Sequence, residues 1–328
     1  MNKIKKLVLF FPIIILLIIN ILFYNNYKYC LKCIYEYKNP ECYKCSIDTI
    51  FKNYYIVNEE KTLKELINYK KSISRFGDGE LKLILGKNLK FQKKNKFLAQ
   101  RLKEVLQSNE KGLLIGINFP IKKKYLKEKL NKYTWSRKMN KYKFIIAKLL
   151  NKKKYYSSNI SRFYMHLKDK TKVSKYIKKL KKLWDKKDIV IIEGEYTRFG
   201  IGNNLLNNAK SIKRIICPSE NSFNVYDIIL KESIKIDKKK LILIALGPTA
   251  TVLTYDLYKL GYQVIDVGHM DIEYEWYLRN TTKKIKINNK YVNEVNNGRK
   301  NITNIRDKNY LKQIITKIIY NITKKKFI

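Results

Sequence analysis

The chain has 328 residues, of which 45% are apolar and 13% are aromatic. This composition supports a sizeable buried core and so excludes a generally disordered chain. The formal net charge of +44, from 71 basic and 27 acidic residues, raises the question of an anionic partner such as nucleic acid or a membrane surface.

The basic residues are almost all lysine, since only nine are arginine, and Asn, Ile and Tyr are also abundant. An AT-rich coding bias would produce this pattern unaided, and selection for an anionic partner is the alternative. In a chain that uses lysine so freely, each arginine indicates a place that needs a planar, bidentate donor.

The first 25 residues read as a membrane anchor. Residues 7–24 carry no charge and follow Lys3, Lys5 and Lys6, and roughly 17–25 apolar residues span a bilayer. A cleaved signal peptide is the alternative, but its apolar region is normally shorter and ends at a small-residue cleavage site that is missing here. We therefore expect a single-pass membrane protein.

Residues 26–55 form a cysteine-rich linker with two CxxC pairs, made by Cys30, Cys33, Cys42 and Cys45. Their spacing suits four thiolates around one structural Zn²⁺. Two disulfides in an oxidising compartment, or reduced or lipidated thiols beside the membrane, are the alternatives.

From residue 55 onward, short apolar runs alternate with segments of helical spacing. The helical segments are 61–71, 96–108 and 174–186. The apolar runs are 112–117, 188–193, 211–216, 240–246 and 262–267. Runs of this kind are typical of buried parallel strands in an α/β protein. We predict one Rossmann-like domain over 56–298, with a mostly parallel sheet and flanking helices.

The C-terminal part gives two further predictions. Residues 284–295 read as a hairpin that turns at Asn288-Asn289. Residues 299–328 read as a basic helix that packs on the body or lies along an anionic membrane face. Its apolar side would consist of Leu311, Ile314, Ile315, Ile318 and Ile319.

Four motifs follow strand-like runs, where α/β proteins bind their ligands. The first, SRFGDGEL at 74–81, displays Arg75, Gly77, Asp78 and Glu80. Glycine lets the backbone approach a ligand closely, and the two carboxylates suit a ribose hydroxyl or a divalent ion. The alternative is an ordinary turn in which Asp78 caps the next helix.

The second motif, EGEYTRFGIGNNL, resembles a phosphate-binding loop. Its loop residues are Arg198, Gly200, Gly202 and Asn203. Backbone N–H groups of such a loop cradle phosphate. As a dinucleotide fingerprint it is incomplete, because Leu205 replaces the third glycine.

The third motif is ALGPTATVL at 245–253, where a strand turns at Gly247 and Thr249 is placed to cap a helix. Helix N-termini bind anions, and a capped helix without a ligand is the alternative.

The fourth motif, VGHMDIEYEW, contains His269, Asp271, Glu273 and Glu275. If the segment is extended, the first three side chains project to one side and form a metal site with nitrogen and oxygen ligands. The alternative is a helix N-terminus with favourable acidic residues.

Taken together, these motifs, with KRIICPSENSF and KYVNEV, resemble the GT-D-type bacterial glycosyltransferases over roughly residues 60–295. The resemblance implies a Rossmann-like fold, a UDP-sugar donor with glucose as the precedent, a glycan acceptor, and Mn²⁺ or Mg²⁺ held at a DxE motif. Asp271-Ile272-Glu273 matches that motif, with His269 beside it. Asp78-Gly79-Glu80 spells it a second time.

The reaction needs charge neutralisation at the leaving diphosphate, which a cation and Arg75 or Arg198 would supply. The carboxylates of Asp78, Glu80 and Glu275 are the candidates for catalysis, including the base for the acceptor hydroxyl. The expected nucleotide-sugar residues are Arg75, Gly77, Asp78, Arg198, Gly200, Gly202, Asn203, Gly247 and Thr249.

This interpretation leaves no role for nucleic acid. If the donor is cytosolic, the catalytic domain should face the cytoplasm, whereas a domain on the other side of the membrane would favour disulfides at the CxxC pairs. A polybasic, membrane-anchored binding protein for an anionic polymer is the alternative from another class. A nicotinamide-dependent oxidoreductase is a third, weakened by the incomplete glycine motif.

Overall fold

The structure, a computed structural model, describes residues 50–118, 142, 144–151, 154–167 and 169–319. The expected anchor and the four cysteines of the CxxC pairs lie outside these residues. Among the described residues, no helix is both long and apolar enough to cross a bilayer. The chain divides into two compact units, Met1–Tyr54 with Pro120–Asn151, and Tyr55–Phe119 with Lys152–Ile328. The second unit carries the sheet and every motif.

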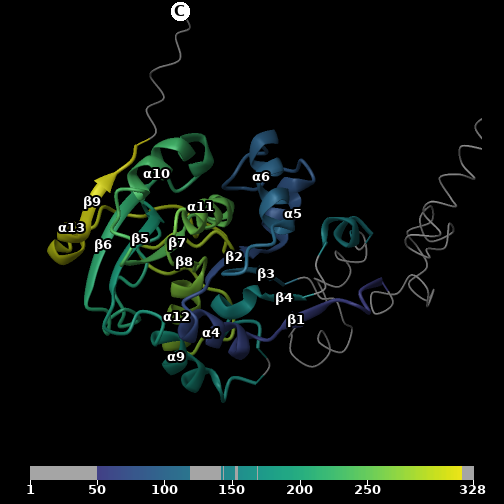
Figure 1. Ribbon diagram of the computed structural model, residues 1–328. Helices are drawn as coiled ribbons and strands as arrows, with labels where there is room; N and C mark the ends of the chain where they lie inside the picture. The colour runs from purple at the N-terminus through teal and green to yellow at the C-terminus, as the bar shows by residue number, and fades with distance from the viewer. Residues whose placement is uncertain (1–49, 119–141, 143, 152–153, 168, 320–328) are drawn as a thin grey trace, which may run out of the picture. The chain divides into compact units, whose positions relative to one another are not determined.

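The described residues form nine strands in one parallel sheet, in the order β1-β4-β3-β2-β8-β7-β5-β6-β9 (Figure 1). The strands are β1 Tyr55–Val57, β2 Ser72–Phe76, β3 Leu113–Ile117, β4 Lys154–Ser157, β5 Asp188–Gly194, β6 Ser211–Cys217, β7 Leu241–Ala245, β8 Val264–Asp266 and β9 Ile314–Lys317. The five predicted apolar runs are β3, β5, β6, β7 and β8. The predicted α/β fold with a parallel sheet is therefore confirmed.

The helices begin where the sequence supplies caps. The Asn58 side chain accepts the Lys61 N–H at the start of α4, and Asn95 accepts the Leu98 N–H at the start of α6. The helices are α4 Glu59–Asn68, α5 Asp78–Ile84, α6 Lys96–Gln107, α9 Val173–Lys181, α10 Tyr226–Ser233, α11 Pro248–Lys259, α12 Met270–Leu278 and α13 Lys308–Gln313. Two short 3₁₀ helices are η2 Ser158–Ser161 and η3 Ser222–Val225.

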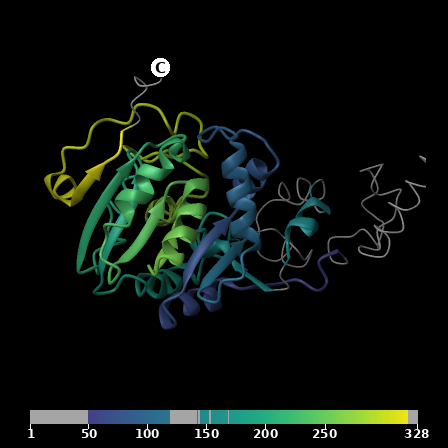
Figure 2. The ribbon, with the colours of Figure 1, turned by 45° about the horizontal axis from the view of Figure 1, so that its top comes forward.

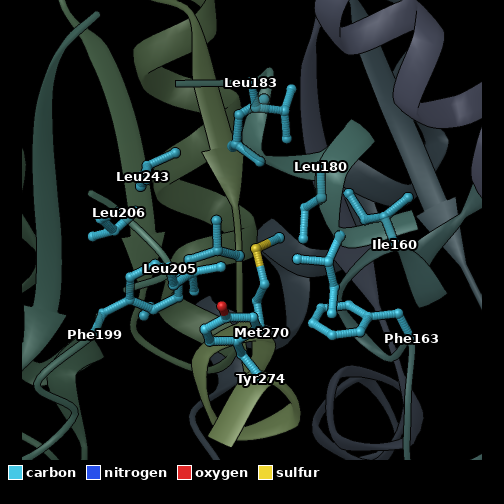
Figure 3. Close-up of a cluster of buried hydrophobic side chains, with 14 of the residues drawn as sticks. Ile160, Phe163, Leu180, Leu183, Phe199, Leu205, Leu206, Leu243, Met270 and Tyr274 are labelled. Carbon is cyan, nitrogen blue, oxygen red and sulfur yellow. The ribbon is translucent and has the colours of Figure 1, made fainter. Parts of the chain in front are cut away.

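Helices cover both faces of the sheet. On one face α11 packs against β2, α6 and α10, and α5 packs against α6. On the other face α4, α9 and α12 contribute to one apolar core, part of which Figure 3 shows. In that view Met270 and Tyr274 of α12 lie between Leu180 of α9 on one side and Phe199 and Leu205 on the other. The loop that follows β5 is thus part of the core.

Strands β2 and β8 are parallel neighbours, and the segments that follow them lie on opposite faces of the sheet. The chain after β2 continues into α5, on the α6 and α11 side of the sheet. The chain after β8 continues into α12, on the α4 and α9 side. Such a switch point, at the carboxyl ends of the strands, is where open α/β sheets bind ligands. The first and fourth motifs meet there.

The C-terminal prediction is wrong in two respects. Of the helix expected over 299–328, only Lys308–Gln313 is helical within the described residues, and the next four residues form β9, which pairs with β6. Ile314, Ile315 and Thr316 are β-branched and find a free sheet edge, so strand pairing replaces the helix. The hairpin expected over 284–295 is also missing. A turn does occur there, with Asn289 at φ 57°, but no strand flanks it.

Candidate functional site

Arg75, in β2, lies at the switch point and holds it together. Its Nε is 2.6 Å from the carbonyl oxygen of Asp266 and its Nη2 is 2.9 Å from the Asp266 carboxylate, at the end of β8. Its Nη1 donates to the carbonyl oxygen of Ser158, 3.1 Å away, and to the Ser161 hydroxyl. Four of the five guanidinium N–H groups therefore have protein partners. Arg75 joins β2, β8 and η2, and few of its N–H groups are left to donate to a ligand.

The next residues place two carboxylates at the start of α5. Gly77 is the N-cap, so the alternative that Asp78 caps the helix is wrong. The Asp78 side chain is 58% exposed and pairs with Lys82, 2.7 Å away. The Glu80 carboxylate accepts the Gly77 N–H at 2.7 Å. Burial raises the pKa of Glu80 to about 7, although the Gly77 N–H opposes the shift.

The second motif holds a carboxylate of the protein itself. The Gly200 N–H donates to Asp271 Oδ1 at 3.0 Å, and Asn203 Nδ2 lies 2.7 Å from the same oxygen and 2.6 Å from Glu275 Oε1. Lys290 Nζ is 2.6 Å from Asp271 Oδ2 and 2.9 Å from Glu275. Lys290 and both carboxylates are buried. The loop that was predicted to cradle a phosphate therefore binds the Asp271 carboxylate instead.

Arg198 has a partner for each terminal nitrogen. Nη1 donates to the carbonyl oxygen of Asn289 at 2.8 Å, and Nη2 donates to that of Thr303 at 2.6 Å. The residue is only 3% exposed. Arg198 thus fixes a segment of the C-terminal part of the chain. This placement differs from the expected contact with a diphosphate.

The fourth motif is helical, and the prediction of an extended segment is wrong. His269 is the N-cap of α12, which begins at Met270. Residues two apart on a helix point about 200° apart, so Asp271 and Glu273 diverge. Glu273 accepts the N–H groups of Tyr164 and Met165 at 3.0 and 2.8 Å.

The three expected metal ligands of this motif therefore do not converge. Among the described residues, no three His, Cys, Asp or Glu side chains are arranged to hold a metal ion.

Arg162 is a site residue that the motif analysis missed. Its Nη2 is 3.1 Å from His269 Nδ1, and its Nη1 is 2.5 Å from Glu294 Oε1. A guanidinium only donates, so His269 Nδ1 accepts and Nε2–H donates to Asn293 Oδ1, 2.7 Å away. Burial and the charge of Arg162 lower the pKa of His269 to about 4. The one signal for Arg162 in the sequence was the scarcity of arginine.

Nearby carboxylates also affect the pKa of the Arg162 guanidinium. Burial alone would lower its pKa, but the carboxylates of Glu294, Glu273 and Asp78 raise it overall. The first of these carboxylates, Glu294, also holds the guanidinium directly.

The third motif forms a close contact with the loop that follows α5. Gly247, at φ 54°, is the N-cap of α11, and Pro248 is the first helical residue, so the prediction that Thr249 caps the helix is wrong. A Cβ on Gly247 would stand 2.9 Å from the Phe91 ring. The Thr249 side chain is fully buried, and its hydroxyl makes no hydrogen bond within the described residues.

Residues 287–303, here called the strap, connect the loops that follow several strands. The Tyr291 N–H donates to the carbonyl oxygen of Tyr196 at 2.8 Å, and its hydroxyl donates to Glu220 at 2.9 Å. Arg299 donates to the carbonyl oxygen of Lys90 at 3.1 Å. Figure 2 shows this part of the chain, in yellow-green, along the top of the view. The strap fixes the loops that surround the switch point.

The family model described as glycosyltransferase GT-D fold matches residues 73–295. The chain belongs to this GT-D glycosyltransferase family. It is 38% identical over 245 residues to a probable glycosyl transferase, Gly, of Streptococcus gordonii, which covers 74% of this chain and 36% of that protein. It is 34% identical over 261 residues to the glycosyltransferase GlyD of Streptococcus pneumoniae serotype 4 (strain ATCC BAA-334 / TIGR4), which covers 79% of this chain and 32% of GlyD. The GT-D chain thus spans about a third of the length of these relatives.

Solved structures agree with the family. One, described as the highly conserved domain of unknown function 1792 with a distinct glycosyltransferase fold, has a TM-score of 0.78 and 37% identity, and the match covers 83% of this chain and 98% of that one. Another, a new glycosyltransferase (DUF1792) from Streptococcus sanguinis, has a TM-score of 0.75 and 33% identity, covering 81% of this chain and 100% of that one. The expected GT-D resemblance is confirmed.

Within this GT-D fold the predicted site residues form two groups. Asp78 and Glu80 lie at the switch point with Arg75, and Asp78 is the one exposed carboxylate of the predicted acidic set. The other group is an internal network behind the second motif. Its predicted members are Gly200, Asn203, Asp271 and Glu275, and Lys290, which was not predicted, joins them.

Proposed function

We propose that this GT-D glycosyltransferase transfers a sugar, with glucose as the family precedent, from a UDP-sugar to a glycan acceptor in surface polysaccharide or glycoprotein synthesis. One observation carries the proposal. The Asp78 carboxylate is exposed at the switch point, and Arg162 directly follows η2, which Arg75 joins to β2 and β8. This combination suits a charged, metal-bound diphosphate.

The exposed Asp78 carboxylate fits a divalent cation. Glu80, two residues on in α5, projects away from it and accepts the Gly77 N–H. Mg²⁺, a hard cation, is usually held by one or two carboxylates together with substrate phosphates, and carboxylates suit Mn²⁺ as well. One exposed carboxylate together with the diphosphate is therefore sufficient. When bound, the cation would neutralise charge on the leaving diphosphate. Asp271 and Glu273 do not fit this role, because both carboxylates are buried as well as bound by internal donors, whereas the Asp78 carboxylate is exposed.

The remaining side chains have separate roles in this proposal. Arg162 presents a fixed positive charge to the diphosphate, and the Glu294 and His269 contacts hold its guanidinium in place. Arg75 keeps β2 and β8 in register, so that Asp78 begins α5 at the correct place. Glu275 pairs with Lys290 and Arg279 inside the protein, so we propose no catalytic role for it.

The membrane setting stays a prediction from the sequence. We propose that residues 7–24 anchor the enzyme and that the catalytic unit faces the cytoplasm, where UDP-sugars are made. A reducing compartment would keep Cys30, Cys33, Cys42 and Cys45 as thiolates and favour Zn²⁺ over disulfides. Protease protection of the catalytic unit in intact membranes tests this orientation.

Calorimetry on the full chain tests the donor. We expect UDP to bind in the presence of Mn²⁺, NAD not to bind, and Asp78→Asn to weaken UDP binding at least ten-fold. Asp227→Asn is the matched control, because Asp227 is also an exposed residue in the first turn of a helix, α10. If UDP fails to bind wild-type protein with Mn²⁺, the glycosyltransferase assignment of donor and metal is wrong.

A further inference from the structure

Phe97 presents an aromatic ring to solvent in the first turn of α6. The residue is 58% exposed. Its ring centroid lies 6.0 Å from that of Phe223 in η3, with 47° between the ring planes. The Phe223 ring is buried and lies 5.0 Å from Tyr226 at the start of α10. Three rings from three elements therefore form a row whose outermost member is exposed.

One carboxylate connects two of the helices that carry the row, α6 and α10. The Tyr226 hydroxyl donates to the carboxylate of Asp256 in α11, and the same carboxylate pairs with Arg101, one helical turn beyond Phe97 in α6. This network ties α6, α10 and α11 together beneath the rings. The exposed Phe97 ring lies outside this network and is accessible to a ligand.

The Phe97 ring lies on the side of the molecule that carries the candidate site. Residues 86–95 connect α5 to α6, and Leu89 within them packs on Gly79, where a Cβ would stand 3.3 Å from the leucine. The carbonyl oxygen of Phe91 accepts the N–H of Asn221, next to η3, at 2.9 Å. One loop thus connects the Asp78-Gly79-Glu80 motif with the ring row.

Polar groups lie beside the row. Glu220, which directly precedes Asn221, pairs with Arg299 at 2.9 Å, and the two side chains are 43% and 33% exposed. An exposed ring beside a carboxylate and a guanidinium is a combination that suits a sugar. The C–H groups of one pyranose face pack on a π-face, and the hydroxyls accept and donate hydrogen bonds at the rim.

We propose that Phe97 is a stacking platform for a pyranose ring of the acceptor glycan, with Glu220 and Arg299 beside it for the hydroxyl groups. The proposal rests on the proposed function and adds a second sugar site to it, separate from the donor site at Asp78. It also predicts that acceptor binding does not require the metal.

Saturation-transfer NMR tests the platform on the full chain, in a detergent without a sugar head group. The probes are methyl β-D-glucopyranoside and methyl N-acetyl-β-D-glucosaminide. We expect saturation of the ring protons of at least one probe with wild-type protein. Phe97→Ala should weaken that binding about five-fold, and Phe97→Trp should retain it.

Tyr69→Ala is the matched control. Tyr69 is 68% exposed at the C-terminal end of α4, close to the start of β2, and so lies at the opposite ends of the strands. Its loss should leave probe binding unchanged. The thermal unfolding temperature of each variant shows that the fold is intact.

Two results would overturn the platform: no saturation of either probe at 20 mM, about the weakest binding worth assigning, or wild-type binding by Phe97→Ala. Calorimetry with UDP and Mn²⁺ on the same samples separates this result from the donor assignment. Intact UDP binding without probe binding rejects the platform alone. Probe binding without UDP binding rejects the donor site and keeps the sugar site.

Discussion

The guanidinium of Arg75 fills the space in which a side chain on Gly268 would lie. A Cβ built on Gly268 would overlap Nη2 of Arg75, and the backbone at Gly268 has φ 46°, in the left-handed region. The glycine of the VGHMD motif is therefore fixed by an arginine almost two hundred residues earlier in the chain. The contact joins the first motif to the fourth.

Gly268→Ala should displace Arg75 from Asp266 and destabilise the protein by about 2–4 kcal/mol, through backbone strain and the broken ion pair. Urea unfolding measures the loss. Gly202→Ala is the control, since Gly202 has φ 75° but open space around its Cα. The control should cost only about 1 kcal/mol. Equal losses in the two variants would show that the Arg75 contact contributes nothing.

Lys290→Met should be among the most damaging single changes in the strap. It would leave the carboxylates of Asp271 and Glu275 buried without their cation, which costs about 3–5 kcal/mol. Lys317→Met removes an exposed pair with Glu195 and should cost less than about 1 kcal/mol. Chemical denaturation of both variants measures the difference, and similar losses would contradict the internal role of Lys290.

His269 should make the protein less stable in mild acid. Its pKa is lowered from 6.5 to about 4 by burial and by Arg162. Between these values the unfolded chain binds the proton and the folded chain does not, so stability falls as the pH falls from 6.5 toward 4. The contribution is at most about 3 kcal/mol.

The unfolding temperature of His269→Gln, followed from pH 7 to pH 4.5, checks this prediction. The variant should lose less stability over that range than wild-type protein does. Parallel curves for the two proteins would show that His269 is not held neutral in the fold.

Asp78→Asn and Asp271→Asn should separate function from stability. Asp78 is exposed, so its change should abolish metal-dependent transfer and leave the unfolding temperature within about 1 °C. Asp271 is buried, with Lys290 and the Gly200 N–H as partners, so its change should lower that temperature by several degrees. A transfer assay and a thermal melt on both variants give the result. If Asp271→Asn alone lost transfer at unchanged stability, the roles of the two motifs would be reversed.

Five strands, β3, β5, β6, β7 and β8, were predictable because they are short, continuous apolar runs. Strands β1 and β4 contain exposed residues and were not predicted. The C-terminal end was also not predictable, because its isoleucines fit a helical stripe and a strand equally well. The free edge of β6 decides between them, and that edge exists only once the sheet has formed. Residues 284–295 likewise form no hairpin, since Lys290 and Asn293 are bound by side chains of α12 and His269.

The site was predictable in composition but not in assignment. All four motifs lie at the carboxyl ends of strands, as parallel topology requires. Two DxE sequences were visible, and only burial separates them, because Asp271 is 2% exposed and the Asp78 side chain is 58% exposed. The prediction that each scarce arginine makes several hydrogen bonds through its planar guanidinium holds for several of them. Arg75, Arg162 and Arg198 each hold several partners, but those partners are mainly internal.

The strap also sets the order in which the enzyme can mature. Asn293 and Glu294, which hold His269 and Arg162 at the switch point, are synthesised more than 200 residues after Asp78. A chain that is still being translated therefore has its acidic motif long before it has the partners that fix the surrounding cations. Closure of such distant contacts is slow. The part of the sheet edge that carries the candidate site should therefore acquire its native structure late.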